Sequence, residues 1–222
     1  MKKSILSLFT FLFIQTISFG QVTQIDLGSE RLLNSSRASD PVEALGSPYV
    51  DENFLPVKIK GYNQLFTGRY NAYNGEMEID LGTKIIALDK NNDYELMYTQ
   101  NNKIYKTYRF ISPSGISKKR FLNVILENEK FTLLKEEIIK YQEKIPAANS
   151  YSKDQPAKFE KSKNNYYLKQ GKSITYISTK KKDLLKTYPE NAKKLKSYLK
   201  ENKISLKKES DMIKLAGFLA DL

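Results

Sequence analysis

GRYNAYNGEMEIDLG, residues 68–82, predicts a β-hairpin and with it a protein built mainly from antiparallel strands. Asn-Gly between two alternating segments is the strongest short-range hairpin signal, because a type I′ turn needs positive φ at both central residues. With Asn74 and Gly75 in those positions, Arg69 would face Asp80 across the hairpin. Strand alternation would then place four side chains on a core face: Tyr70, Ala72, Met77 and Ile79.

The other face of this hairpin is polar and supplies the candidate binding residues: Arg69, Asn71, Tyr73, Glu76, Glu78 and Asp80. One wet face is ordinary for an antiparallel sheet, so the simplest interpretation is a solvated surface. The functional alternative is a face that binds a sugar or a peptide. Paired catalytic carboxylates are a further alternative, because acids two residues apart on a strand are separated by ~6–7 Å, which overlaps both glycosidase geometries. A catalytic acid would also need burial to raise its pKa.

The first twenty residues have the parts of a secretory signal peptide. Lys2 and Lys3 form a positive start, and residues 6–14 form an apolar run that ends shortly before the small residue Gly20. This run is too short to span a bilayer, which needs ~20 apolar residues. We therefore expect cleavage between Gly20 and Gln21 and an exported mature chain, periplasmic or secreted, without a transmembrane segment.

The composition limits the chemistry, because the 222 residues include neither His nor Cys. Zinc sites of the usual ligand sets, Ser-His-Asp and Cys-His nucleophiles and thiol redox chemistry all need these side chains. We predict no metal and no cofactor. Carboxylate, Lys or Tyr chemistry remains available, so the composition favours a non-enzymatic protein without excluding an enzyme.

The order of patterns predicts an α+β fold: an antiparallel β meander, as a curled sheet, barrel or sandwich, followed by a C-terminal helical hairpin or cap. We divide the chain into a signal peptide (1–20), a flexible leader (21–47), a β domain (48–179) and a helical segment packed on it (180–222). Within the leader, a weak strand is expected at Val22–Leu27.

Short polar turns separate the alternating segments of the β domain. Strands are expected within 56–62, 84–90, 94–100, 103–111, 120–128, 130–141 and 158–178. Hairpin turns are expected at Lys90–Asp93, Glu127–Lys130, Lys163–Asn164 and Gln170–Gly171. Apolar residues in 131–142 also fit helical spacing, and here a strand is favoured over a helix.

Residues 89–93 resemble the start of a calcium-binding loop, with Asp89, Asn91 and Asp93 at the first three ligand positions. The sixth position is Tyr94 where an EF-hand needs Gly, and the twelfth is Gln100 where it needs Glu. The segment is therefore interpreted as a hairpin turn.

After residue 179 the apolar period changes to that of helices, which are expected within 180–188, 187–202 and 204–222. Thr187 and Glu190 have the spacing of a capping box for the second helix. The last helix has one apolar face formed by Met212, Leu215, Ala216 and Leu219.

The net charge of +12 is concentrated in residues 153–208, which contain 17 Lys and 5 acidic residues. No Arg follows residue 120, so this segment has no guanidinium that could form bidentate hydrogen bonds to a base. A nucleic acid is therefore not the expected partner. Lysines on the wet faces of strands and helices are the plain interpretation. The functional one is contact with an anionic envelope polysaccharide or lipid headgroups. Another protein, or a second copy that pairs through an edge strand, is a further hypothesis.

Four segments together resemble a family of uncharacterised exported proteins of Bacteroidota: GSPYVDENF (46–54), GRYNAYNGEMEID (68–80), QPAKFEKSKNNYYLK (155–169) and 180–215. The resemblance extends from about Gly46 to the C-terminus and implies export and a single domain. The family contributes neither an activity nor functional residues. Asp is expected at position 75 in this family, and the Gly found here indicates that the position serves backbone geometry.

Two functional hypotheses follow from the sequence. The first is an exported β-rich binding or envelope-associated module, without enzymatic activity, that has a basic C-terminal third. The alternative is a carboxylate-only glycan hydrolase that uses the acids of residues 76–80.

Overall fold

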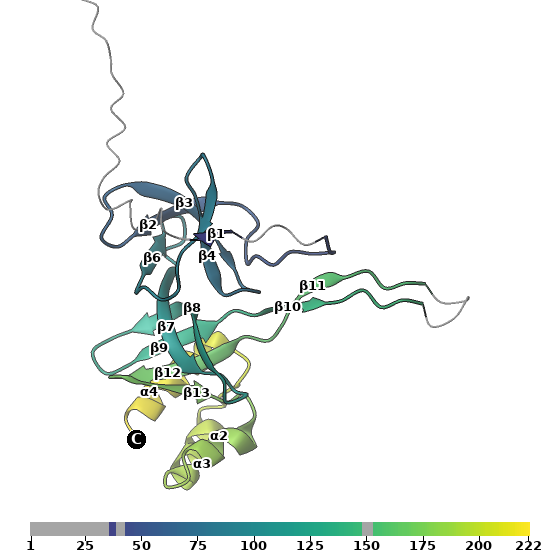
Figure 1. The fold of residues 1–222 in the computed structure, drawn as a ribbon. Helices are drawn as coiled ribbons and strands as arrows, with labels where there is room; N and C mark the ends of the chain where they lie inside the picture. The colour runs from purple at the N-terminus through teal and green to yellow at the C-terminus, as the bar shows by residue number, and fades with distance from the viewer. Residues whose placement is uncertain (1–35, 39–42, 148–152) are drawn as a thin grey trace, which may run out of the picture.

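The computed structural model describes residues 36–38, 43–147 and 153–222 of the chain (Figure 1). These residues form one antiparallel sheet of eleven strands, a separate two-stranded ribbon and three helices that follow the last strand. The predicted α+β class with a C-terminal helical cap is confirmed, and the sheet is open because its two ends, β1 and β13, are not paired with each other.

The strands of the large sheet, in chain order, are β1 (Ser36–Arg37), β2 (Leu55–Ile59), β3 (Leu65–Asn71), β4 (Glu76–Asp80), β5 (Ile85–Ala87), β6 (Glu95–Tyr98), β7 (Ile104–Ile111), β8 (Ser117–Glu127), β9 (Thr132–Glu136), β12 (Asn165–Gln170) and β13 (Ser173–Ile177). The ribbon consists of β10 (Ile139–Gln142) and β11 (Lys158–Lys161). The helices are α2 (Lys181–Thr187), α3 (Ala192–Glu201) and α4 (Glu209–Ala220).

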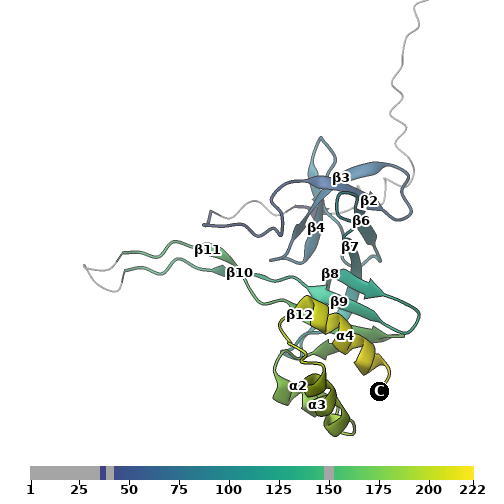
Figure 2. The same cartoon turned by 180° about the vertical axis from the view of Figure 1, so that it is seen from behind.

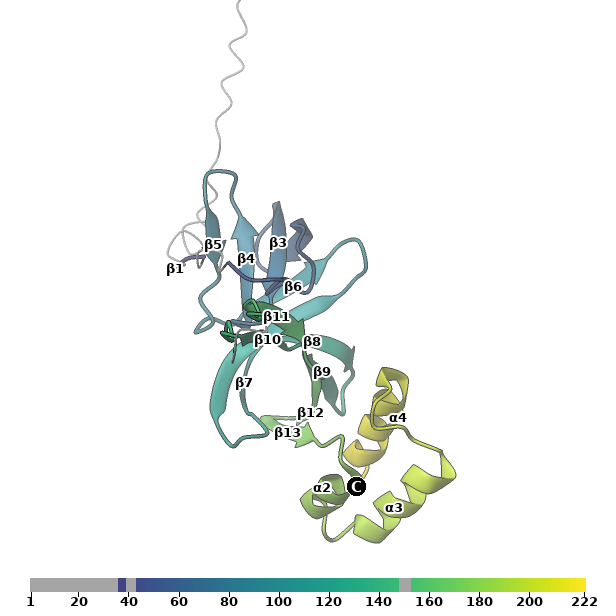
Figure 3. The ribbon, with the colours of Figure 1, turned by 90° about the vertical axis from the view of Figure 1, so that its right-hand side faces the viewer.

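The strand order across the sheet is β1-β5-β4-β3-β2-β6-β7-β8-β9-β12-β13. The two long central strands, β7 and β8, join a first lobe (β1–β6) to a second lobe (β9, β12, β13 and the helices). Figure 3 shows the sheet curling in the second lobe, so that β13 comes back toward β7. The β10–β11 ribbon projects sideways from between the lobes (Figure 1).

Each lobe has its own apolar core. Tyr70, Met77, Ile79 and Leu96 are fully or almost fully buried in the first lobe. In the second lobe the helices cover β9 and β12, and the α4 residues Met212, Leu215, Ala216 and Leu219 are buried as predicted (Figure 2). A small third cluster, formed by Phe110, Leu122, Leu134 and Tyr167, lies inside the curl of the second lobe.

The hairpin at residues 68–82 forms, but its predicted register is wrong by two residues. Arg69 lies opposite Glu78 instead of Asp80, and residues 72–75 form the loop. Asn71 closes the loop, because its carbonyl accepts the Gly75 N–H (2.8 Å) and its side chain accepts the Asn74 N–H (3.0 Å). Gly75 alone in the loop has positive φ (70°), so the turn is not type I′.

A slip of two residues leaves the faces of both strands unchanged, because side chains alternate with a period of two. The four residues assigned to the core face are accordingly all buried: Tyr70, Ala72, Met77 and Ile79.

Residues 131–142 form strands β9 and β10, as favoured over a helix. The hairpins at Glu127–Lys130 and Gln170–Gly171 are confirmed by the pairing of β8 with β9 and of β12 with β13. The hairpin predicted at Lys90–Asp93 is wrong, because β5 pairs with β4 and β6 pairs with β2. The hairpin predicted at Lys163–Asn164 is also wrong, because β11 pairs with β10 and β12 pairs with β9. A polar turn marks the end of a strand but does not determine its partner, which long-range packing selects.

The turn after β5 has no vacant set of calcium ligands. The Asp89 carboxylate accepts the Asn91 N–H (2.9 Å), and Asp93 forms an ion pair with Lys119 (3.2 Å). Residues 89–93 therefore form a turn, but not the expected hairpin turn, because β5 and β6 do not pair with each other.

The predicted capping box of the second helix is wrong. Thr187 is the last residue of α2, where its hydroxyl donates to the Asp183 carbonyl, and Asn191 precedes α3. Pro189 lies between the helices and lacks the N–H that would continue α2, which explains the early end.

Two described parts of the predicted flexible leader are hydrogen-bonded to strands. β1 pairs with β5, and Leu45 donates to the Ala157 carbonyl and accepts from the Phe159 N–H beside β11. The signal peptide, the Gly20–Gln21 cleavage point and the strand expected at Val22–Leu27 lie outside the described residues. Within the described residues, every helix is too short or too polar to cross a bilayer.

Gly75→Ala should destabilise the protein far more than Gly82→Ala. Both glycines have positive φ (70° and 78°), which costs a residue with a side chain about 1–2 kcal/mol. A Cβ at Gly75 would also overlap the Arg120 guanidinium, whereas a Cβ at Gly82 meets nothing within 4 Å. Urea denaturation should give a loss of about 3 kcal/mol or more for Gly75→Ala, since hydrogen bonds of Arg120 are lost as well. Equal losses for the two variants would contradict the close packing of Arg120 on the loop.

Candidate functional site

Three of the six predicted binding residues form a buried network in place of a solvated face. The Glu78 side chain is 1% exposed and accepts from Arg69 Nε (3.0 Å) and Asn71 Nδ2 (3.3 Å). Tyr49 completes the network: its hydroxyl donates to Glu78 (3.2 Å) and accepts from Arg69 Nη2 (2.7 Å). Burial, followed by the charge of Glu78, raises the pKa of Tyr49 to about 12. The network therefore satisfies a buried ion pair and stabilises the hairpin.

The other three predicted residues do not join this network. Glu76 pairs with Lys90 (2.8 Å), and Asp80 accepts the Gly82 N–H (2.7 Å). Tyr73, which is 43% exposed, packs against Phe159 of the ribbon with ring centroids 5.4 Å apart. The six residues consequently do not form one continuous surface.

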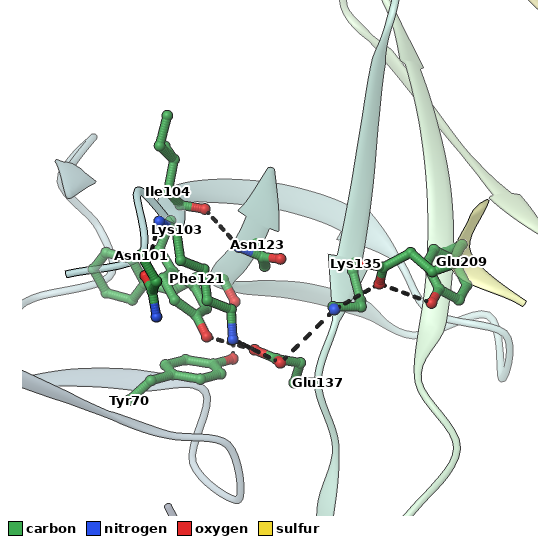
Figure 4. Close-up of polar contacts among 11 residues, drawn as sticks. Tyr70, Asn101, Lys103, Ile104, Phe121, Asn123, Lys135, Glu137 and Glu209 are labelled. Atoms are coloured by element: carbon green, nitrogen blue, oxygen red, sulfur yellow. Dashed lines mark hydrogen bonds and ion pairs between the residues drawn. The ribbon is translucent and has the colours of Figure 1, made fainter. Parts of the chain in front are cut away.

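A second polar cluster, which the sequence did not reveal, lies at the junction of the two lobes (Figure 4). Glu137 accepts from Lys103 Nζ (2.9 and 3.1 Å) and from the Tyr105 hydroxyl (2.5 Å). Lys135 lies 4.0 Å from Glu137 and 2.7 Å from Glu209 of α4, which connects the cluster to the helical cap. Burial, and then the charge of Glu137, raises the pKa of Tyr105 well above its ordinary value.

The neighbouring acid Glu136 points to the opposite side of its strand and holds a third network. It accepts from Arg120 Nη1 (3.2 Å), the Tyr167 hydroxyl (2.9 Å) and Asn165 Nδ2 (2.9 Å). The sequence signal that could have revealed both clusters is the pair of adjacent acids, Glu136 and Glu137, after an apolar segment. Successive side chains of an extended chain point to opposite faces, so two adjacent acids place one carboxylate on each face.

Two cavities border the cluster around Glu137. One, of about 120 Å³, is lined by Tyr70, Tyr98 and Tyr105 together with Arg69, Asn101 and Lys103. The other, of about 270 Å³, is lined by Glu137 itself, Ile138, Ile139, Lys161, Ser162 and Asn164. Arg69 is thus the predicted binding residue that reaches a cavity.

Between Lys163 and Lys208, most of the basic charge predicted for the C-terminal third is exposed and lacks an ion-pair partner among the described residues. Fourteen lysines lie between Lys163 and Lys208, and the same stretch has three acids: Asp183, Glu190 and Glu201. None of these lysines forms an ion pair with another described residue, although ten lysines elsewhere in the described chain do. This basic surface covers the helical cap and the β12–β13 hairpin.

Within residues 36–38, 43–147 and 153–222, acidic side chains do not gather in a group of three that could hold a metal ion. Comparison of the chain with protein-family models, curated proteins and solved structures found no match.

Removing one partner of the buried Arg69–Glu78 pair should be strongly destabilising. Arg69→Met leaves Glu78 buried without a counter-charge, which costs about 3–5 kcal/mol, and adding Glu78→Met should recover part of that loss. Lys130→Met is the control, because it breaks an exposed pair with Asp221 that contributes about 0–1 kcal/mol. Chemical denaturation of the four proteins measures these values. A double variant less stable than Arg69→Met would contradict the role assigned to the pair.

Proposed function

We propose that the protein is an exported, non-enzymatic binding module that holds an anionic polysaccharide of the cell envelope through its helical cap. The observation that carries this proposal is the set of fourteen lysines between Lys163 and Lys208 without ion-pair partners among the described residues. Unneutralised like charges on one part of a fold repel one another, and an anionic polymer relieves that repulsion.

The arrangement of these lysines suits a polymer better than a small anion. On α3, Lys193, Lys196 and Lys200 are exposed and lie on one face, over a rise of about 10 Å along the helix. Lysines present point charges on flexible stems and select no particular base or bidentate group. Repeated carboxylate, sulfate or phosphate groups on a sugar chain match a row of such charges. Export, indicated by the N-terminal pattern, would place the protein where envelope polysaccharides occur.

The glycan hydrolase hypothesis has less support. Glu76 and Glu78 are each paired with a cation, and Asp80 accepts a backbone N–H. A general acid would have to be free to hold and deliver a proton at a substrate. Joint replacement of the three acids by their amides should leave glycan hydrolysis unchanged in a reducing-sugar assay, and loss of a wild-type activity would favour the hydrolase.

The proposed function predicts salt-sensitive retention of the protein on polygalacturonate-agarose and none on neutral dextran-agarose. Raising NaCl from about 0.1 M to about 1 M shortens the Debye length from about 10 Å to about 3 Å and should release the protein. Lys193→Gln/Lys196→Gln/Lys200→Gln should weaken binding at least ten-fold, because each lysine beside an anionic surface contributes about 1 kcal/mol.

A matched control is Lys58→Gln/Lys84→Gln/Lys140→Gln, which removes the same charge from exposed lysines that form no ion pair with described residues. Binding should remain within about two-fold of the wild type. Equal losses of binding in the two triple variants would mean that net charge, and not the row of lysines on α3, determines binding. Retention that about 1 M NaCl does not change would contradict the proposal.

A further inference from the structure

We infer that the 120 Å³ cavity beside Lys103 is a binding site for one neutral sugar ring. The cavity lies in the first lobe, between the segment that precedes β2, strand β3 and the turn that joins β6 to β7. It uses none of the lysines of the helical cap, so this inference goes beyond the proposed function and does not rest on it.

The size and access of the cavity suit a single ring. A volume of about 120 Å³ is the liquid volume of about four water molecules and is close to that of a cavity of about 150 Å³ that holds one benzene ring, so one six-membered ring can enter it in part. Its rim residues Asp51, Asn53 and Asn101 are exposed, whereas its tyrosines are buried. A ligand can therefore enter past polar groups, and beneath them it meets the small exposed part of the three tyrosines, which are 1–5% exposed.

The floor is formed by three tyrosine rings in contact. The Tyr70 and Tyr105 centroids are 4.8 Å apart, and those of Tyr98 and Tyr105 are 5.9 Å apart. The C–H faces of a sugar ring pack on such apolar ring surfaces.

The hydroxyl of Tyr98 is the polar group that most needs a ligand. This side chain is 5% exposed, and among the described residues its hydroxyl contacts only the Met77 sulfur (3.2 Å), which is a weak acceptor. By contrast, the Tyr70 and Tyr105 hydroxyls donate to the Phe121 carbonyl and to Glu137. A ligand hydroxyl in the cavity would give Tyr98 a full hydrogen-bond partner.

The charges around the cavity favour a neutral ligand over an anionic one. Lys103 and Arg69 are already neutralised by Glu137 and Glu78, as Figure 4 shows for Lys103. A carboxylate ligand would find no free cation among the lining residues and would meet the Asp51 carboxylate.

The polar groups at the rim are of both kinds. One Asp51 carboxylate oxygen already accepts from the Asn53 N–H (2.9 Å) and Nδ2 (3.3 Å), which leaves its second oxygen to accept from a ligand. The Asn101 side-chain amide can donate because only its oxygen is engaged, by the Lys103 N–H. A hydroxyl both donates and accepts, so a polyhydroxylated ring matches a site that mixes these groups.

The test is a ¹H–¹⁵N NMR titration of the protein with glucose, galactose, N-acetylglucosamine and glucuronate as separate probes. At least one neutral sugar should give saturable shifts of amides in residues 50–55 and 98–105, with a Kd of about 1–10 mM, the range of a small ligand with few contacts. It should bind at least five-fold more tightly than glucuronate. Tyr98→Phe should weaken this binding at least five-fold.

The matched control is Tyr108→Phe, which removes a hydroxyl from a half-buried tyrosine of β7 outside the cavity and should leave the titration unchanged. Absence of saturable shifts with all four probes, or shifts that Tyr98→Phe leaves unchanged, would overturn the inference. The triple lysine variant of α3 should retain sugar binding, which separates failure of this site from failure of the polysaccharide proposal.

Discussion

Arg120 is the side chain on which the joining of the two lobes depends. It extends from the shared strand β8 and donates to the Ala72 (3.1 Å) and Tyr73 (2.5 Å) carbonyls in the β3–β4 loop. In the other direction it bonds to Glu136 at the end of β9. Because both the guanidinium and the carboxylate are largely buried, neither can leave the pair without a large desolvation penalty. The loop, β8 and the second lobe therefore hold one another in place.

The same rule explains why Glu78, the buried acid among the predicted site residues, is structural. Charges taken out of water remain ionised only when paired and hydrogen-bonded, and Glu78, Glu136 and Glu137 each have a cation and at least one further donor. Charges available to a partner are instead those without a counter-ion. Many of them lie on the helical cap and the β12–β13 hairpin, between Lys163 and Lys208. The charges that stabilise the fold and those proposed to bind a partner are thus different groups of the chain.

Local patterns predicted the local features of the fold, and long-range contacts determined the rest. The alternation in residues 68–82 assigned the four apolar core residues of the hairpin correctly, because a two-residue slip preserves faces. The register itself depends on the Asn71 side chain and on Arg120 packed against Gly75, neither of which the Asn-Gly signal contains. Lys103 and Glu137, separated by 34 positions, meet through strand pairing that no turn signal specifies. The lysine count was evident in the sequence, whereas the lack of acidic partners required the three-dimensional arrangement.

The coupling of the lobes through Arg120 is tested most directly by native-state hydrogen exchange of the wild type and of Arg120→Met. If Arg120 joins the lobes, the opening free energies of amides in β3 and β4 and of those in β9 and β12 should fall together, by about 3 kcal/mol or more. Loss of protection confined to one lobe, with the other unchanged, would contradict this account.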